Sequence, residues 1–248
     1  MRLGGTVKPK AILVTGTDTG VGKTFVACGI AASLRRRGLR VGPFKPAETG
    51  CGWDAETETL VAADARLLQE ASGSSAAPEV ICPFRFRSPV APAVAAEIEG
   101  LAFEVPEIKK RLEDCFFALT SSHDVVIVES AGGIFVPLVY GFHYGDLAQL
   151  LDLPVLVVAG SKLGVLNHAL LTLSFLGRAG LEVVGCVLNH TSAERTLATE
   201  TNVNALRKLG SVPLFVVPHF PEGSSDRGTQ EFDGLSAHIL EFLERQSP

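Results

Sequence analysis

One stretch near the N-terminus constrains the fold of this chain more than any other: Ala11-Ile-Leu-Val-Thr-Gly16-Thr-Asp-Thr-Gly20-Val-Gly22-Lys23-Thr24. An apolar run typical of a β-strand ends at Gly16, a glycine-rich loop follows, and the next ten residues favour a helix. Strand, loop and helix in this order predict a phosphate-binding loop. Glycines tolerate positive φ, so backbone N–H groups can converge on an anion, and the start of the helix adds further unpaired N–H groups.

Two side chains at the end of this loop suit a nucleotide bound with magnesium. Lys23 can reach the β- and γ-phosphates, and the Thr24 hydroxyl is a hard oxygen ligand for Mg²⁺. The spacing is a variant of the common motif, because the position of its first glycine is occupied by Thr17 and the glycine falls at Gly16.

Composition excludes several classes of protein. The 248 residues are 46% hydrophobic with a net charge of −5, which gives enough core for one large domain or two small ones and no basic field for nucleic acid. No apolar run approaches the ~18 residues of a membrane span. Residues 1–9 predict a flexible leader without the apolar core of a signal peptide. The five cysteines lack metal or redox spacing, which indicates reduced thiols and a cytoplasmic protein.

The remainder of the chain alternates apolar strands with helices. We expect strands over 11–16, 39–44, 124–129, 153–159, 181–188 and 212–217 and helices over 23–37, 60–71, 106–121, 164–179 and 193–209, the last with a capping box of Thr191 and Glu194. Residues 72–106 are irregular but apolar and predict a covering segment with one short strand. The pattern predicts an α/β fold with a mostly parallel sheet of about seven strands, helices on both faces, and a single domain over 10–248.

Ligands of such sheets bind beyond the carboxyl ends of the strands. Glu129 lies at the end of a predicted strand, and Lys45, Asn189, Pro218 and His219 follow predicted strands. Glu129 stands where a nucleotide-hydrolysing enzyme places a carboxylate near Mg²⁺, although a salt-bridged glutamate fits the same position.

Two other charged residues are less certain from the pattern alone. Asp64 lies on a predicted helix, where an aspartate is more often a solvated charge. Lys45 fits equally well as a surface lysine or as a second cation for an anionic ligand.

Several motifs together resemble the dethiobiotin synthetases. The segment Gly16–Thr24 is similar to that family's GTDTxVGKT, Lys45–Gly50 to its KPxxTG, Val128–Gly133 to its VEGAGG, and Lys162–His168 to its KLGxxNH. Asn189 and Pro218 fall where the family has its adenine-contacting segments. The order of the motifs matches, and the resemblance covers about residues 10–220.

The resemblance implies a P-loop NTPase-like fold and an ATP- and Mg²⁺-dependent cyclo-ligase of biotin synthesis. In that family, one amine of 7,8-diaminononanoate takes up CO₂ to form a carbamate. A carbamate oxygen attacks the γ-phosphoryl group of ATP to give a carbamic-phosphoric anhydride. The second amine then closes the ureido ring of dethiobiotin and expels phosphate.

The resemblance also implies roles for individual residues. Lys23 and Lys45 are the expected catalytic residues, and Thr24, Asp64 and Glu129 are the expected Mg²⁺ ligands. The expected ATP contacts are Asp18, Thr19, Gly20, Val21, Gly22, Lys23, Thr24, Asn189, Pro218 and His219. The expected substrate contacts are Thr19, Lys45, Thr49 and, from the partner subunit of a homodimer, Gly164, Val165, Leu166 and Asn167.

The chain departs from the family pattern in two places. Ser130 replaces the first glycine of GAGG, which would alter the loop if that position needs positive φ. In the SPHxAA segment, Ala91 and Ala93 replace the serine and the histidine, so any contact made by those two side chains is missing here.

A partition- or cell-division-type ATPase, which acts as a dimerising switch, is the alternative. Its loop reads KGGxGKT, with a lysine at the position of Asp18, and this chain lacks that lysine. ATP hydrolysis stimulated by DNA or lipid would indicate the switch, whereas activity dependent on diaminononanoate and bicarbonate would indicate the ligase.

Overall fold

The computed structural model describes residues 10–221 and 229–246, so the predicted leader lies outside the described residues. Within that part of the chain, a sheet of six strands forms the centre of the molecule. Its order is β12 (Leu214–Val217), β11 (Val183–Asn189), β10 (Val155–Gly160), β1 (Ala11–Gly16), β7 (Val125–Gly133) and β2 (Val41–Phe44). All neighbouring strands run parallel. The predicted α/β fold is confirmed, with six strands in this sheet rather than seven.

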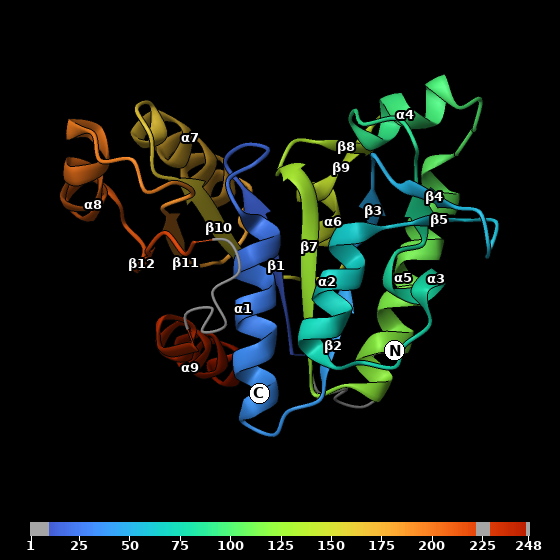
Figure 1. The fold of residues 1–248 in the computed structure, drawn as a ribbon, viewed down its shortest axis with the longest axis horizontal. Helices are drawn as coiled ribbons and strands as arrows, with labels where there is room; N and C mark the ends of the chain where they lie inside the picture. The colour runs from blue at the N-terminus through green and yellow to red at the C-terminus, as the bar shows by residue number, and fades with distance from the viewer. Residues whose placement is uncertain (1–9, 222–228, 247–248) are drawn as a thin grey trace.

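Helices cover both faces of the sheet (Figure 1). One face carries α1 (Lys23–Arg36), α2 (Ala63–Ser72) and α9 (Thr229–Arg245), and the other carries α5 (Val105–Ser122), α6 (Tyr144–Leu150), α7 (Val165–Arg178) and α8 (Leu197–Leu209). Strand residues alternate between the two layers. Ile12 and Val14 pack with the first set of helices, and Leu13 with the second. Because side chains alternate across a strand, a run that is apolar at every position must be covered on both sides.

The strand order places the phosphate loop in the middle of the sheet edge. Strand β1 lies between β10 and β7, and their carboxyl ends meet at the same edge. The loops after β2, β7 and β11 therefore surround the loop that follows β1, as the strand-end argument predicts.

Several local predictions need correction. The predicted helix over 60–71 begins at Ala63, because Leu60 and Val61 belong to β5 (Thr59–Val61), which forms a hairpin with β4 (Gly52–Asp54). Residues 72–106 hold the expected short strand, β6 (Phe84–Arg85), paired with β3 (Ala47–Glu48). They also contain two helices that were not predicted, α3 (Pro78–Ile81) and α4 (Pro92–Ile98).

The C-terminal half differs in three places. Strand β7 continues past Glu129 to Gly133, and a hairpin of β8 (Pro137–Val139) and β9 (Phe142–His143) follows it. The capping box of α8 is formed by Thr196 and Thr199 rather than by Thr191 and Glu194, so the helix starts four residues later than predicted. Helix α9 was not predicted. None of the described helices is long and apolar enough to cross a membrane.

Candidate active site

The phosphate loop between β1 and α1 has the backbone that its glycines predict. Gly20 and Gly22 adopt φ of 74° and 85°, values that residues with a Cβ rarely adopt. Gly16 is needed for a different reason, because a Cβ there would lie 2.7 Å from the carbonyl oxygen of Asp18. This explains why a glycine stands one residue earlier than in the common motif: the chain turns back on itself directly after β1.

Two lysines bring positive charge to the loop. Lys23 is 7% exposed, and its ammonium donates a hydrogen bond to the carbonyl oxygen of Asp18 at 3.3 Å. Burial, with the nearby charge of Lys45, lowers the pKa of Lys23 below its usual value. Two buried cations that disfavour each other are stabilised by an anion, which is what a triphosphate supplies.

Lys45 joins the phosphate loop to two carboxylates. Its Nζ donates to Oε1 of Glu129 at 2.7 Å and to Oδ2 of Asp64 at 3.1 Å. Burial opposes the charge of Lys45, but the two carboxylates outweigh burial and raise its pKa. The Thr24 hydroxyl donates to the same Glu129 oxygen at 2.7 Å. Lys45, directly after β2, thus meets residues of α1, α2 and β7 within hydrogen-bond distance.

These oxygen atoms fit a magnesium ion. Glu129 is fully buried, and its Oε2 has no hydrogen-bond partner, which is costly unless a cation or water binds there. With Asp64 and Thr24 it offers two carboxylates and a hydroxyl, the hard donors that Mg²⁺ prefers while keeping several waters. No group of three or more His, Cys, Asp or Glu residues suited to a metal occurs in the described part of the chain.

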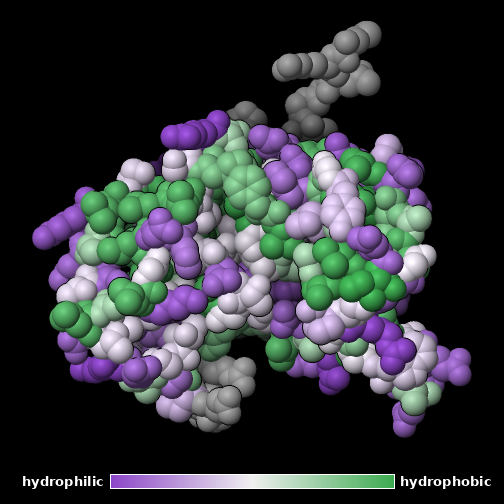
Figure 2. Space-filling model, turned by 90° about the horizontal axis from the view of Figure 1, so that it is seen from above, coloured by the Kyte–Doolittle hydropathy of each residue, from purple (hydrophilic) through white to green (hydrophobic). Residues whose placement is uncertain are grey.

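A cleft of about 530 Å³ opens above these groups. Its lining includes most of the predicted phosphate, metal and substrate residues, namely Thr19, Gly20, Gly22, Lys23, Thr24, Lys45, Thr49 and Asp64. Figure 2 views the molecule from above and shows hydrophilic and hydrophobic residues mixed over this face. The cleft is also lined by apolar side chains, among them Val90, Ala131 and Val136.

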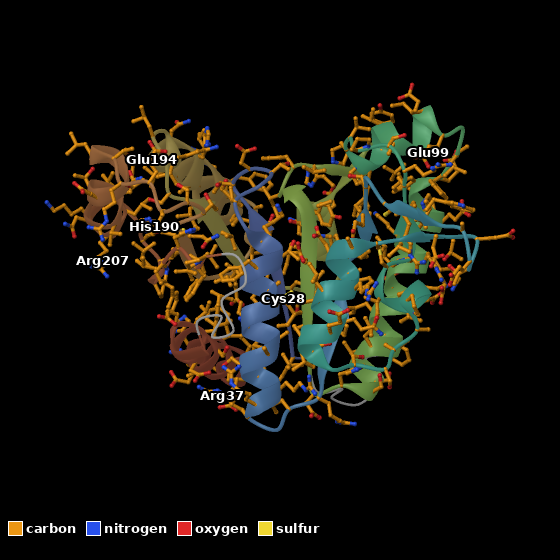
Figure 3. The ribbon with its side chains drawn as sticks, in the orientation of Figure 1. Cys28, Arg37, Glu99, His190, Glu194 and Arg207 are labelled. Atoms are coloured by element: carbon orange, nitrogen blue, oxygen red, sulfur yellow. The ribbon has the colours of Figure 1, made fainter. Side chains whose placement is uncertain are left out.

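The predicted base-binding residues lie elsewhere. Pro218 and His219 line a second pocket of about 470 Å³ with His190 and Glu194; the last two are labelled near α8 in Figure 3. Asn189 is buried, and its Nδ2 donates to the carbonyl oxygen of Val21 at 3.0 Å. Its side chain is therefore fixed to the phosphate loop as well as being close to this pocket.

The predicted carboxylate site at Gly164–Asn167 does not line the main cleft. Gly164 is the N-cap of α7 with φ of 94°, and Gly164 and Asn167 are exposed while Val165 is buried. Leu163 beside them is 87% exposed.

Of the departures from the family motifs, the structure explains Ser130 and locates Ala91 and Ala93. Ser130 is not among the described residues with positive φ, so glycine is not required there. Its hydroxyl donates to the carbonyl oxygen of Gly132 at 2.9 Å. Ala91 is the N-cap of α4 and lines the cleft, and Ala93 is buried within the same helix.

Sequence reasoning missed two residues beside the site. Glu48 is buried, lines the cleft and binds the start of α2 through its carboxylate. Its place between Lys45 and Thr49 in one motif was the available signal. Tyr144 is fully buried near Lys45, and burial raises the pKa of its phenol; nothing in the local sequence marks it.

Comparison with known proteins decides the family. Residues 10–222 match a family described as an AAA domain. The chain is 41% identical over 214 residues to the ATP-dependent dethiobiotin synthetase BioD of Anaeromyxobacter dehalogenans, covering 86% of this chain and 92% of that protein. It is 37% identical over 229 residues to the synthetase of the same name from Aquifex aeolicus, covering 92% and 97%. The chain belongs to the ATP-dependent dethiobiotin synthetase family.

Solved structures place the synthetase among more distant proteins of the same fold. The cell division ATPase MinD of Pyrococcus furiosus has a TM-score of 0.54 at 17% identity, covering 94% of this chain and 99% of that one. Cobyrinic acid a,c-diamide synthase of Mycobacterium smegmatis, solved with ADP and magnesium, has a TM-score of 0.54 at 18% identity, covering 95% of each chain. At these identities the likeness shows the fold alone, so the cell-division ATPases lend no support to the switch alternative.

Proposed function

We propose that this chain joins CO₂ to 7,8-diaminononanoate in an ATP- and Mg²⁺-dependent reaction that gives dethiobiotin, ADP and phosphate. The observation that carries the proposal is the placement of Lys45. A buried ammonium at the end of β2 points toward Glu129 and lines the same cleft as Lys23 and Thr24 of the phosphate loop. Binding a nucleotide requires the phosphate loop, but transferring its γ-phosphoryl group to an anion also requires a second cation.

The charge of Lys45 addresses the main barrier of this reaction. A carbamate is anionic and must approach an anionic triphosphate, and two unit charges ~4 Å apart repel by about 4 kcal/mol at an effective dielectric near 20. An ammonium between them offsets that repulsion and stabilises the charge that develops in the transition state. Lys23, which lines the same cleft, would act on the β- and γ-phosphates.

Thr24, Glu129 and Asp64 would hold the magnesium ion. When bound, the ion would neutralise charge on the phosphate oxygens and orient them. The orphaned Oε2 of Glu129 and the partly exposed Asp64 supply the carboxylate oxygens, and Lys45 would then remain beside the same carboxylates.

The diamine end of the substrate would be held at the cleft by Thr19 and Thr49, which line it next to Lys45. We assign the other end, a carboxylate, to the start of α7 in a second copy of the chain, where the backbone N–H groups of Gly164–Asn167 suit an anion. Exposed apolar side chains around that helix, Leu163 and Leu171, support a homodimer because burial between two copies would remove them from water.

The purine of ATP would lie at the second pocket, beside Pro218 and His219, with Asn189 between base and loop. Asp18, Gly20, Val21 and Gly22 would surround the phosphates. We also infer that residues 10–248 form one domain, since helices at both ends of the described chain pack on the same sheet.

A product assay tests the function directly. The purified protein is mixed with ATP, Mg²⁺, bicarbonate and 7,8-diaminononanoate, and dethiobiotin is measured by mass together with ADP. We expect equimolar dethiobiotin and ADP, and no dethiobiotin when any one component is omitted. ATP hydrolysis at the same rate with and without the diamine, and with no dethiobiotin formed, would refute the proposal.

A further inference from the structure

Glu48 occupies an unusual position beside the cleft. It is only 6% exposed, yet it makes no ion pair within 4 Å in the described part of the chain. Instead, its Oε1 accepts a hydrogen bond from the backbone N–H of Asp64 and its Oε2 accepts one from that of Ala65, both at 2.9 Å. Both carboxylate oxygens are thus used on the first turn of α2.

Helix α2 needs this contact because it does not cap itself. Its N-cap residue is Ala62, which has no side-chain acceptor. The first N–H groups of a helix have no partner inside the helix and must be satisfied from outside. A carboxylate does this well, since it also interacts favourably with the positive end of the helix dipole. The cap is supplied by Glu48, sixteen residues before Asp64.

The backbone of Glu48 is itself held in place. β3 pairs with β6, and the carbonyl oxygen of Glu48 accepts a hydrogen bond from the N–H of Phe86 at 2.9 Å. Three residues before Glu48 stands Lys45, whose ammonium contacts the Asp64 carboxylate at 3.1 Å. One short segment therefore fixes both the cation and the helix end that carries its carboxylate partner.

We propose that Glu48 is a positioning residue that sets the Asp64 carboxylate into the metal site by clamping the first turn of α2. The inference rests on the proposed function, in which Asp64 is a Mg²⁺ ligand. Because both of its oxygens are engaged by backbone N–H groups, Glu48 acts through Asp64 and does not bind the ion itself.

The consequence for the site is geometric. Without the clamp, α2 would retain its packing on α1 through residues such as Leu68, but its first turn would lose two hydrogen bonds to a charged acceptor. Asp64, which is partly exposed, would then sample positions away from Lys45 and the ion. Outer partners of metal ligands typically control affinity by about 10–100-fold.

Binding of Mn²⁺, a spectroscopic substitute for Mg²⁺, tests the clamp. The full chain and the variants Glu48→Gln and Glu48→Ala are saturated with ADP, and free Mn²⁺ is measured by electron paramagnetic resonance. We expect Mn²⁺ affinity to fall about 10–100-fold in Glu48→Ala and by less in Glu48→Gln, which keeps one acceptor oxygen. Affinity for ADP in the presence of a chelator should change less than twofold, because the loop is untouched.

Glu70→Gln is the matched control. It removes the same charge from the exposed side of α2, where Glu70 pairs with Arg66 at 3.0 Å, and should leave Mn²⁺ affinity unchanged. Unchanged Mn²⁺ affinity in both Glu48 variants would overturn the proposal. So would an equal loss of metal-free ADP affinity, since that would mean general damage to the site. Dethiobiotin formation by the unaltered chain is scored separately, so failure of the clamp and failure of the proposed reaction are distinguishable.

Discussion

The ammonium of Lys45 lies 2.7 Å from Oε1 of Glu129, and both side chains are almost completely buried. Glu129 shares that oxygen with the Thr24 hydroxyl of the phosphate loop. The contact therefore links the end of β2, the middle of β7 and the start of α1 through one carboxylate oxygen. A buried charge that loses its partner is strongly destabilising, so this pair couples the stability of the fold to the electrostatics of the site.

We expect Lys45→Gln to separate nucleotide binding from ligation. ADP–Mg²⁺ affinity should not fall, because Lys23 and the loop amides remain. Dethiobiotin formation should fall by about 10²-fold or more, the scale seen when one preorganised charge is lost. Calorimetry for the nucleotide and a product assay on the same preparation check both halves. If affinity fell in proportion to turnover, Lys45 would be only a phosphate ligand.

The same variant should lose stability in the absence of metal. Glu129 would remain buried without its cation, and breaking such a pair costs about 3–5 kcal/mol. Adding Mg²⁺ with ADP should restore part of this, since the ion would neutralise Glu129. Urea unfolding with and without Mg²⁺–ADP measures it. Equal destabilisation in both conditions would argue against a metal at Glu129.

Glu129→Gln should weaken metal binding more than folding. The amide oxygen can still accept from Thr24 and Lys45, but the charge facing the ion is lost. We expect Mn²⁺ affinity in the ADP complex to fall by about 100-fold or more, at or above the upper end of the cost of losing an outer partner. Glu113→Gln, on the exposed side of α5, is the surface control. Normal Mn²⁺ affinity in Glu129→Gln would remove Glu129 from the ligand set.

The sequence was informative where function depends on residues next to one another. The loop around Gly22 and the predicted strand ends near Lys45 and Glu129 are local patterns, and the parallel-sheet rule predicts that they lie at one edge. The sequence was less informative where tertiary contacts determine the role of a side chain. Asp64 looks like a solvated helix charge until α2 is packed against β2. The capping role of Glu48 has no local signature, because its two partners lie sixteen and seventeen residues away.

Wrong local predictions have similar causes. Thr191 and Glu194 have the spacing of a capping box, but the chain after β11 stays irregular and Thr196 caps α8 instead. The strand count was too high because the short strand expected over 72–106, β6, pairs with β3 outside the central sheet.

Replacing both Leu163 and Leu171 by Asp should convert the proposed dimer into a monomer. These side chains are 87% and 63% exposed, and charges there would oppose burial between two copies. Light scattering should give twice the chain mass of 26.2 kDa for the unaltered protein and that mass for the variant. Dethiobiotin formation should also fall in the monomeric variant. Leu209→Asp, an exposed leucine on α8, should leave the dimer intact. A monomeric unaltered protein with full activity would contradict the shared site.

Asp124 gives the fold an acid-sensitive contact at the edge of the sheet. Its carboxylate accepts from the backbone N–H of Arg40 at 2.8 Å and from the guanidinium at 2.6 Å, and these bonds lower its pKa to about 2. Because the folded pKa lies below the unfolded value of about 3.9, the stabilisation is complete above pH ~4 and disappears as pH falls through about 2. Asp124→Asn should therefore be less stable than the unaltered chain at pH 7, and the two should converge toward pH 2.

Urea unfolding at pH 7, 5, 4 and 3 measures this convergence. Arg40→Met should show the same dependence of stability on pH. The double variant should lose less free energy of unfolding than the two single variants together, since the residues are direct partners. A stability gap that stays constant from pH 7 to pH 3 would assign the loss to something other than ionisation of Asp124.

Variants of Asn189 test whether this side chain orders the phosphate loop or contacts the purine of ATP. Its Nδ2 donates to the carbonyl oxygen of Val21, and a Cβ on Gly22 would lie 2.2 Å from the same nitrogen, so the side chain is packed against the phosphate loop. We expect Asn189→Ala to weaken ATP binding by about 2–10-fold, the net worth of one hydrogen bond. Asn189→Asp should cost more, because a carboxylate would face the Val21 carbonyl oxygen without a proton to donate. Inorganic tripolyphosphate, which has no base, is the decisive probe in calorimetry. If Asn189 shapes the loop, tripolyphosphate affinity falls by the same factor as ATP affinity. A loss confined to ATP would mean that Asn189 acts on the purine and that its bond to Val21 does not set the loop.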